Sequence, residues 1–137
     1  MYDEDRTDDF VRKFRNIAVV GLSENPERPS YDVASYLASH GFNIIPVNPA
    51  IESWNGIKAY PDLRSIPPGL KVEIVDIFRR SDQVLPIVED AIARHPDVIW
   101  MQEGVINREA ADLARKNNVS VVMDRCIKKE HMRHSHR

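Results

Sequence analysis

The sequence has 137 residues, 29% of them charged, and a formal net charge of −2 at pH 7. This length predicts a single domain, and the small negative charge does not favour nucleic acid or an anionic membrane as a partner. With one cysteine and no apolar run as long as a membrane span or a secretory signal, we expect a cytoplasmic protein.

The first predicted elements are a leading helix and a strand–loop–helix unit. Apolar residues at helical spacing predict the leading helix over 5–14. An apolar run over 16–21 ends at Gly21 and predicts a strand, and a polar loop follows it. The next helix covers 31–40, with Ser30 as its expected cap.

The rest of the chain alternates between strands and helices. Residues 50–70 form a long crossover that we expect to be only partly helical, with a brief strand near 57–60. The further predicted strands are 42–47, 72–78, 98–101 and 119–123. Helices are expected between them, beginning near Ser81 or Asp82 and at Asn107. This alternation predicts an α/β fold: a Rossmann-like doubly wound sheet of about five parallel strands in one domain.

Polar residues and glycines follow the predicted strands. Ligands of an open parallel sheet bind beyond the carboxyl ends of its strands, so these residues are candidates for a binding site. They are Gly21, Leu22, Ser23, Asn48, Pro49, Phe78, Arg79, Arg80, Gln102, Glu103, Gly104, Asp124, Arg125 and Cys126.

The loop after the first strand can seat a phosphate. Ser23, Arg28, Ser30 and Tyr31 surround the start of the helix, where backbone N–H groups and the helix dipole favour an anion. A diphosphate is the expected ligand. The alternative is that Ser30 only caps the helix and Arg28 is a solvated loop residue.

The signatures of other nucleotide sites are absent from the sequence. After Gly21 the next glycine is Gly41, so the three-glycine fingerprint for NAD is missing. The second strand ends in Val47-Asn48-Pro49, without the acidic residue that would bind the ribose hydroxyls of NAD. No Gly-Lys-Ser or Gly-Lys-Thr indicates a P-loop.

Arg79 and Arg80 directly follow the strand at 72–78. They can hold a further phosphate in bidentate geometry, or they can be surface arginines. If the strands at 42–47 and 72–78 pair, Pro49 and Phe78 are placed to sandwich a flat base. Otherwise both residues can belong to the core.

Six ordered motifs together resemble the small stand-alone CoA-binding domain proteins, which are similar to the N-terminal CoA-binding domain of the succinyl-CoA synthetase alpha subunit. The resemblance covers about residues 14–133. The motifs are Val20-Gly21-Leu22-Ser23, Arg28-Pro29-Ser30-Tyr31, Pro46-Val47-Asn48-Pro49, Val75-Asp76-Ile77-Phe78-Arg79-Arg80, Trp100-Met101-Gln102-Glu103-Gly104 and Asp124-Arg125-Cys126.

This resemblance implies a Rossmann-type fold that holds CoA across the strand exits. By position it assigns the diphosphate to Gly21, Leu22, Ser23, Arg28, Ser30 and Tyr31. It assigns the ribose and adenine to Asn48 and Pro49, the adenine and 3′-phosphate to Phe78, Arg79 and Arg80, and the pantetheine arm to Gln102, Glu103 and Gly104. Many relatives carry a lysine after the Val-Asn-Pro segment, whereas Ala50-Ile51 follows here.

Three functions stay open on the sequence. The first is a non-catalytic module that binds CoA or acyl-CoA, since the synthetases use a histidine of a second domain that this chain lacks. The second is a subunit of an acyl-CoA ligase whose catalytic domain lies on another chain. The third is a Rossmann protein that binds NADP. A protein partner or a homo-oligomer is compatible with each.

The remaining titratable residues point to no catalytic or metal site. His40 and His95 are expected at the ends of helices, away from the ligand edge. His131, His134 and His136 can in principle bind a metal, but a frayed, solvated terminus is the more ordinary interpretation. The acidic start of the chain is likewise expected to be solvated.

Two residues near the predicted crevice have open roles. Asp76 is expected to be structural, because no partner for it is visible. Cys126 follows the last strand, where a mixed disulfide with CoA is conceivable, although a buried inert thiol is the more ordinary interpretation.

Overall fold

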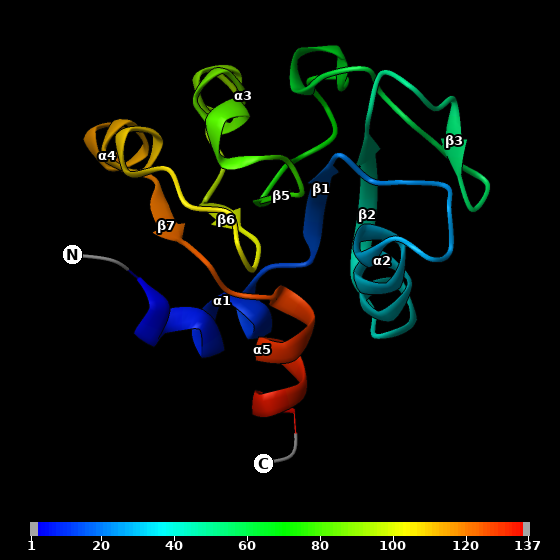
Figure 1. Cartoon of the computed structure of the whole chain (residues 1–137), viewed down its shortest axis with the longest axis horizontal. Helices are drawn as coiled ribbons and strands as arrows, with labels where there is room; N and C mark the ends of the chain where they lie inside the picture. The colour runs from blue at the N-terminus through cyan, green and yellow to red at the C-terminus, as the bar shows by residue number, and fades with distance from the viewer. Residues whose placement is uncertain (1–2, 136–137) are drawn as a thin grey trace.

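A computed structural model describes residues 3–135 of the chain (Figure 1). Its elements are η1 (Glu4–Arg6), α1 (Thr7–Lys13), β1 (Asn16–Val20), α2 (Pro29–Ser39), β2 (Asn43–Val47), β3 (Ser53–Trp54), β4 (Ile57–Lys58), η2 (Leu63–Ser65), β5 (Ile74–Ile77), η3 (Ser81–Gln83), α3 (Val84–Ile92), β6 (Val98–Met101), α4 (Arg108–Lys116), β7 (Ser120–Val122) and α5 (Ile127–His134). Strands and helices alternate as the sequence predicts.

The core is a five-stranded sheet in the order β2-β1-β5-β6-β7, with every pairing parallel. Its strands are rich in Val and Ile and are buried on both faces, which is typical of a parallel sheet between layers of helices. The predicted Rossmann-like α/β fold is confirmed.

Helices cover both faces of this sheet, as Figure 1 shows. α3 and α4 pack on one face, where Val88 and Ala111 are fully buried, and α1, α2 and α5 pack on the other, where Leu37 and Ile127 are fully buried. No helix among residues 3–135 combines the length and apolar character needed to cross a bilayer.

The carboxyl ends of four strands lie level with one another. Val47, Val20, Ile77 and Met101 are neighbours across β2, β1, β5 and β6. The chain moves outward from β1 to β2 and then returns to β5 on the other side of β1, so the direction of winding reverses between β1 and β5. In a doubly wound sheet this switch point is where a ligand crevice opens.

Because β1 lies between β2 and β5, the condition for placing Pro49 and Phe78 around a flat base is not met. Strands 42–47 and 72–78 do not pair, so Pro49 and Phe78 do not follow adjacent strands. The long crossover contains the β3–β4 hairpin and the short 3₁₀ helix η2, and it is only partly helical, as expected.

Both ends of the described chain are tied to the body, although several of their charged side chains, such as Asp5, Asp9 and Arg133, are exposed as expected. The backbone N–H of Val121 donates to Asp3 Oδ2 and that of Met123 to Glu4 Oε2, both at 2.9 Å. α5 carries His131 and His134 and is anchored by a buried 2.7 Å hydrogen bond from Thr7 to Glu130. The expected frayed terminus is therefore corrected up to Ser135, while His136 lies outside the described residues.

Candidate functional site

The switch point is built on a close approach of two backbones. Gly21 directly follows β1, has a φ of +86°, and donates its N–H to Val47 O at 2.8 Å. A Cβ at this position would overlap the carbonyl oxygen of Phe78 and would lie 3.4 Å from Arg79 Cζ. Glycine is therefore required by the contact between the ends of β1 and β5, in addition to its φ.

The loop after Gly21 is closed by its own hydrogen bonds. Ser30 does not cap α2, because Arg28 is the N-cap residue and makes no side-chain cap bond. Instead Ser30 Oγ, which is buried, accepts the backbone N–H of Ser23 at 3.0 Å. Ser23 Oγ in turn accepts the N–H of Asn25. The expected cap is corrected: Ser30 fastens the loop to the helix.

Asn48 fixes the neighbouring exit in a similar way. Its Nδ2 donates to Leu22 O and its Oδ1 accepts the N–H of Ala50, both at 2.9 Å. Leu22 itself is fully buried. These two residues hold the rim of the crevice in shape.

The two arginines after β5 differ in their surroundings. Arg80 is exposed and pairs with Asp82 at 3.3 Å. Arg79 is half-buried and lies over Gly21, and within residues 3–135 its guanidinium has neither a hydrogen-bond nor an ion-pair partner. An unpaired guanidinium at the switch point is suited to bind an anion.

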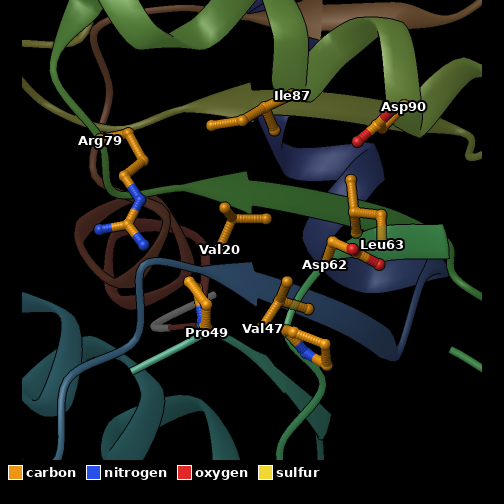
Figure 2. Close-up of a pocket in the computed structure, with 9 residues that line it drawn as sticks. Val20, Val47, Pro49, Asp62, Leu63, Arg79, Ile87 and Asp90 are labelled. Carbon is orange, nitrogen blue, oxygen red and sulfur yellow. The ribbon is translucent and has the colours of Figure 1, made fainter. Parts of the chain in front are cut away.

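Arg79 borders a first cavity of about 170 Å³ (Figure 2). The walls beside it are mainly apolar and come from Val20, Val47, Pro49, Leu63 and Ile87. Asp62 and Asp90 lie on the side away from Arg79. The cavity has a size and mainly apolar walls that suit a small planar group.

Arg79 also borders a second, larger cavity of about 550 Å³. It extends over the exits of β5 and β6 to the start of α2, and its lining is more polar. The lining residues are Pro29, Val33, Phe78, Arg79, Arg80, Gln83, Gln102, Glu103, Val105 and Cys126. Because Arg79 belongs to both cavities, an anion held there would have an apolar recess on one side and a longer cleft on the other.

The structure brings together one part of the predicted site. Pro49, Phe78, Arg79, Arg80, Gln102 and Glu103 line the two cavities. The linings of these two cavities do not include Gly21, Leu22, Ser23, Arg28, Ser30, Tyr31, Asn48 or Gly104. Gly104 donates its N–H to Asp124 Oδ1 at 2.7 Å, and Tyr31 packs edge-on against Trp54.

Several lining residues were missed by the sequence reasoning. Pro29 and Val33 are four positions apart on α2, so helical spacing would have placed both on one face near the crevice. Asp62 and Leu63 come from the crossover, whose path depends on long-range packing that local patterns do not reveal. Gln83 lies in η3, just beyond the β5 exit.

β5 also contains a buried acid. Asp76 is fully buried, and in the described chain neither of its carboxylate oxygens has a hydrogen-bond partner. Burial raises the pKa of the Asp76 carboxyl well above its usual range. Asp76 follows Ile74 by two positions in β5, so both side chains point to the face of the sheet that α1, α2 and α5 cover.

His40 and His131 lie together, away from the two cavities. His131 accepts or donates a 2.7 Å hydrogen bond with Tyr36 Oη, and the ring of His40 stacks on Tyr36. Burial, followed by the charges of His40, Arg15 and His134, lowers the pKa of His131. Residues 3–135 contain no group of three or more His, Cys, Asp or Glu side chains arranged to hold a metal.

Comparisons with known proteins identify the family. The model of the CoA binding domain matches residues 15–132. The chain is 37% identical over 123 residues to the Bacillus subtilis (strain 168) protein YneT, covering 90% of each. A hypothetical protein from Pyrococcus horikoshii OT3 superimposes with a TM-score of 0.90 at 38% identity, over 97% of this chain and 92% of that one.

A more distant relative is an enzyme subunit. The alpha subunit of acetate–CoA ligase [ADP-forming] II from Pyrococcus furiosus (strain ATCC 43587 / DSM 3638 / JCM 8422 / Vc1) is 34% identical over 73 residues, which are 53% of this chain and 16% of that subunit. The similarity is thus to a small part of the ligase subunit. The resemblance inferred from the six motifs is confirmed, and the chain belongs to the CoA-binding domain family.

Proposed function

We propose that this protein binds coenzyme A or a short acyl-CoA at the switch point, without catalysis of its own. The observation that carries the proposal is the unpaired guanidinium of Arg79, which borders both cavities in a chain of the CoA-binding domain family. CoA combines a flat base, charged phosphates and a long arm. An apolar recess, a free cation and a larger cleft in that order are complementary to these parts.

In this arrangement the adenine occupies the first cavity between Pro49 and Ile87, and Arg79 binds a phosphate. The pantetheine arm follows the second cavity along Phe78, Gln102 and Glu103. The loop after β1 uses several of its backbone N–H groups in its own hydrogen bonds, so it supports the site and does not bind the phosphates with all of its amides. This assigns Ser23, Ser30 and Asn48 to shaping the rim.

A thermal-shift series tests the proposal. CoA, acetyl-CoA, dephospho-CoA, NADP and NAD are each added to the protein under reducing conditions. Ligand at a hundred times its dissociation constant stabilises a protein by about 2.7 kcal/mol, which is readily visible. We expect the largest shift with CoA, a smaller one with dephospho-CoA and the smallest with NAD. A larger shift with NADP than with CoA would contradict the assignment.

A further inference from the structure

The second cavity contains the only thiol of the chain. The sequence has one cysteine, Cys126, and its side chain is free. The residue is 8% exposed and belongs to the cavity wall together with Phe78 and Arg79. The thiol is therefore sheltered from bulk solvent but borders the cleft assigned to the pantetheine arm.

The backbone around Cys126 is held firmly against β6. Trp100 Nε1 donates to Arg125 O at 2.9 Å, and the Arg125 N–H donates to Met101 O at 3.3 Å. Cys126 is then the N-cap residue of α5, with an extended backbone at φ −90° and ψ 119°. These bonds fix the position of the thiol on the cavity wall.

A second residue of the same wall offers a free polar group. Gln102 is 4% exposed, and its Oε1 accepts the N–H of Ile127 at 3.1 Å. This bond fixes the orientation of the amide and leaves Nε2 without a hydrogen-bond partner among residues 3–135. Since Gln102 lines the cavity, this donor is available to a carbonyl of an amide-containing arm beside Cys126.

Cys126 lies at the start of α5, close to one charged pair. Cys126 precedes the N-terminus of an eight-residue helix, where backbone N–H groups favour negative charge. Lys129 on the first turn donates to both carboxylate oxygens of Glu103 at 3.0 Å. The hydrogen bond to Glu103 and its negative charge raise the pKa of the Lys129 ammonium, so this cation stays charged beside the cleft.

We propose that Cys126 is a thiol–disulfide exchange site for the disulfide form of CoA, an inference that rests on the proposed CoA site. The Cys126 thiol first loses its proton to solvent. Its sulfur then attacks one sulfur of the CoA disulfide, a new protein–CoA disulfide forms, and the original S–S bond breaks. The departing CoA thiolate takes up a proton, and a second thiol later reverses the step.

Intact-mass analysis after incubation with CoA disulfide tests the inference. We expect one adduct per chain, equal to CoA less two hydrogens, that disappears with dithiothreitol and is absent from Cys126→Ser. Arg79→Ala should slow adduct formation by CoA disulfide at least about tenfold, the loss expected for one charge-assisted contact. Glutathione disulfide, which lacks the nucleotide, should react more slowly and be insensitive to Arg79→Ala.

A matched control places the thiol elsewhere. In Cys126→Ser combined with Ser39→Cys, the single thiol lies at the exposed end of α2. Its reaction with CoA disulfide should not depend on Arg79. If Cys126 gives no adduct although CoA shifts the melting temperature under reducing conditions, the exchange site is wrong. Equal rates of Cys126 adduct formation with CoA disulfide and glutathione disulfide would overturn the exchange site as well. Absence of that shift instead overturns the proposed function.

Discussion

The exit of β1 and the segment Ile74–Arg80 meet at the switch point, but they use their polar groups differently. In the loop after β1, Ser30 Oγ accepts the N–H of Ser23, Ser23 Oγ accepts that of Asn25, and Asn25 Oδ1 accepts that of Glu27. In the β5 segment, Asp76 and Arg79 lack such partners within residues 3–135. Asp76 lines neither cavity, whereas Arg79 borders both, so a bound anion would give the Arg79 guanidinium the partner that it lacks.

The largest expected effect is at the contact between the two regions. Gly21→Ala places a Cβ against the carbonyl of Phe78 and forces an alanine to a φ of +86°. We expect the free energy of unfolding to fall by at least about 3 kcal/mol, measured by urea denaturation. Gly41→Ala is the matched control, because Gly41 has a φ of +89° with open space around it and should lose only about 1–2 kcal/mol. Equal losses would show that the backbone approach is not tight.

The buried acid of β5 should make the protein less stable as pH rises. Because burial raises the folded-state pKa of Asp76, the folded state holds a proton that the unfolded state releases above about pH 4. Asp76→Asn removes the ionisable group, and with it the free-energy cost of keeping the buried carboxyl protonated at neutral pH. It should therefore raise the free energy of unfolding by about 1–3 kcal/mol at pH 7 and by less at pH 4.

Denaturant unfolding at both pH values measures this difference. Asp97→Asn, at an exposed position, serves as the control and should stay within about 0.5 kcal/mol of the parent protein. An advantage of Asp76→Asn that does not change with pH would contradict the assignment of a protonated buried carboxyl.

The two arginines after β5 should contribute unequally to binding. Arg79→Ala removes the unpaired cation between the cavities, so we expect CoA affinity to fall by about tenfold or more in calorimetry. Arg80→Ala removes an exposed side chain that already pairs with Asp82, and should change affinity less than about twofold. The reverse order would place the phosphate outside the switch point.

The smallest expected effect is in the loop after β1. Ser30→Ala removes the hydroxyl that accepts the N–H of Ser23, which should cost about 1 kcal/mol of stability. Because this bond shapes the loop without lining a cavity, CoA affinity should change less than it does in Arg79→Ala. Thermal melting with and without CoA separates the two contributions. A loss of affinity as large as that of Arg79→Ala would mean that the loop itself holds the ligand.

The sheet could be predicted from the sequence because its strands are short, mainly apolar segments rich in Val and Ile, and parallel pairing follows from alternation with helices. The strand exits, including Arg79 and Gln102, followed from that fold. The partner of Ser30 could not be predicted, since it depends on how the loop folds back by seven residues. The sequence Arg79-Arg80 also does not reveal which of the two arginines forms an ion pair with a carboxylate. The first cavity could not be predicted either, because residues of the long crossover line it and the path of this crossover is set by long-range packing.

The most direct test of the account is a crystal structure of the protein with bound CoA. The account predicts a phosphate of CoA within hydrogen-bond distance of the Arg79 guanidinium, the adenine beside Pro49 and the arm running along Gln102 toward Cys126. CoA bound away from the exits of β1 and β5, or an Arg79 side chain turned to solvent in the complex, would contradict it.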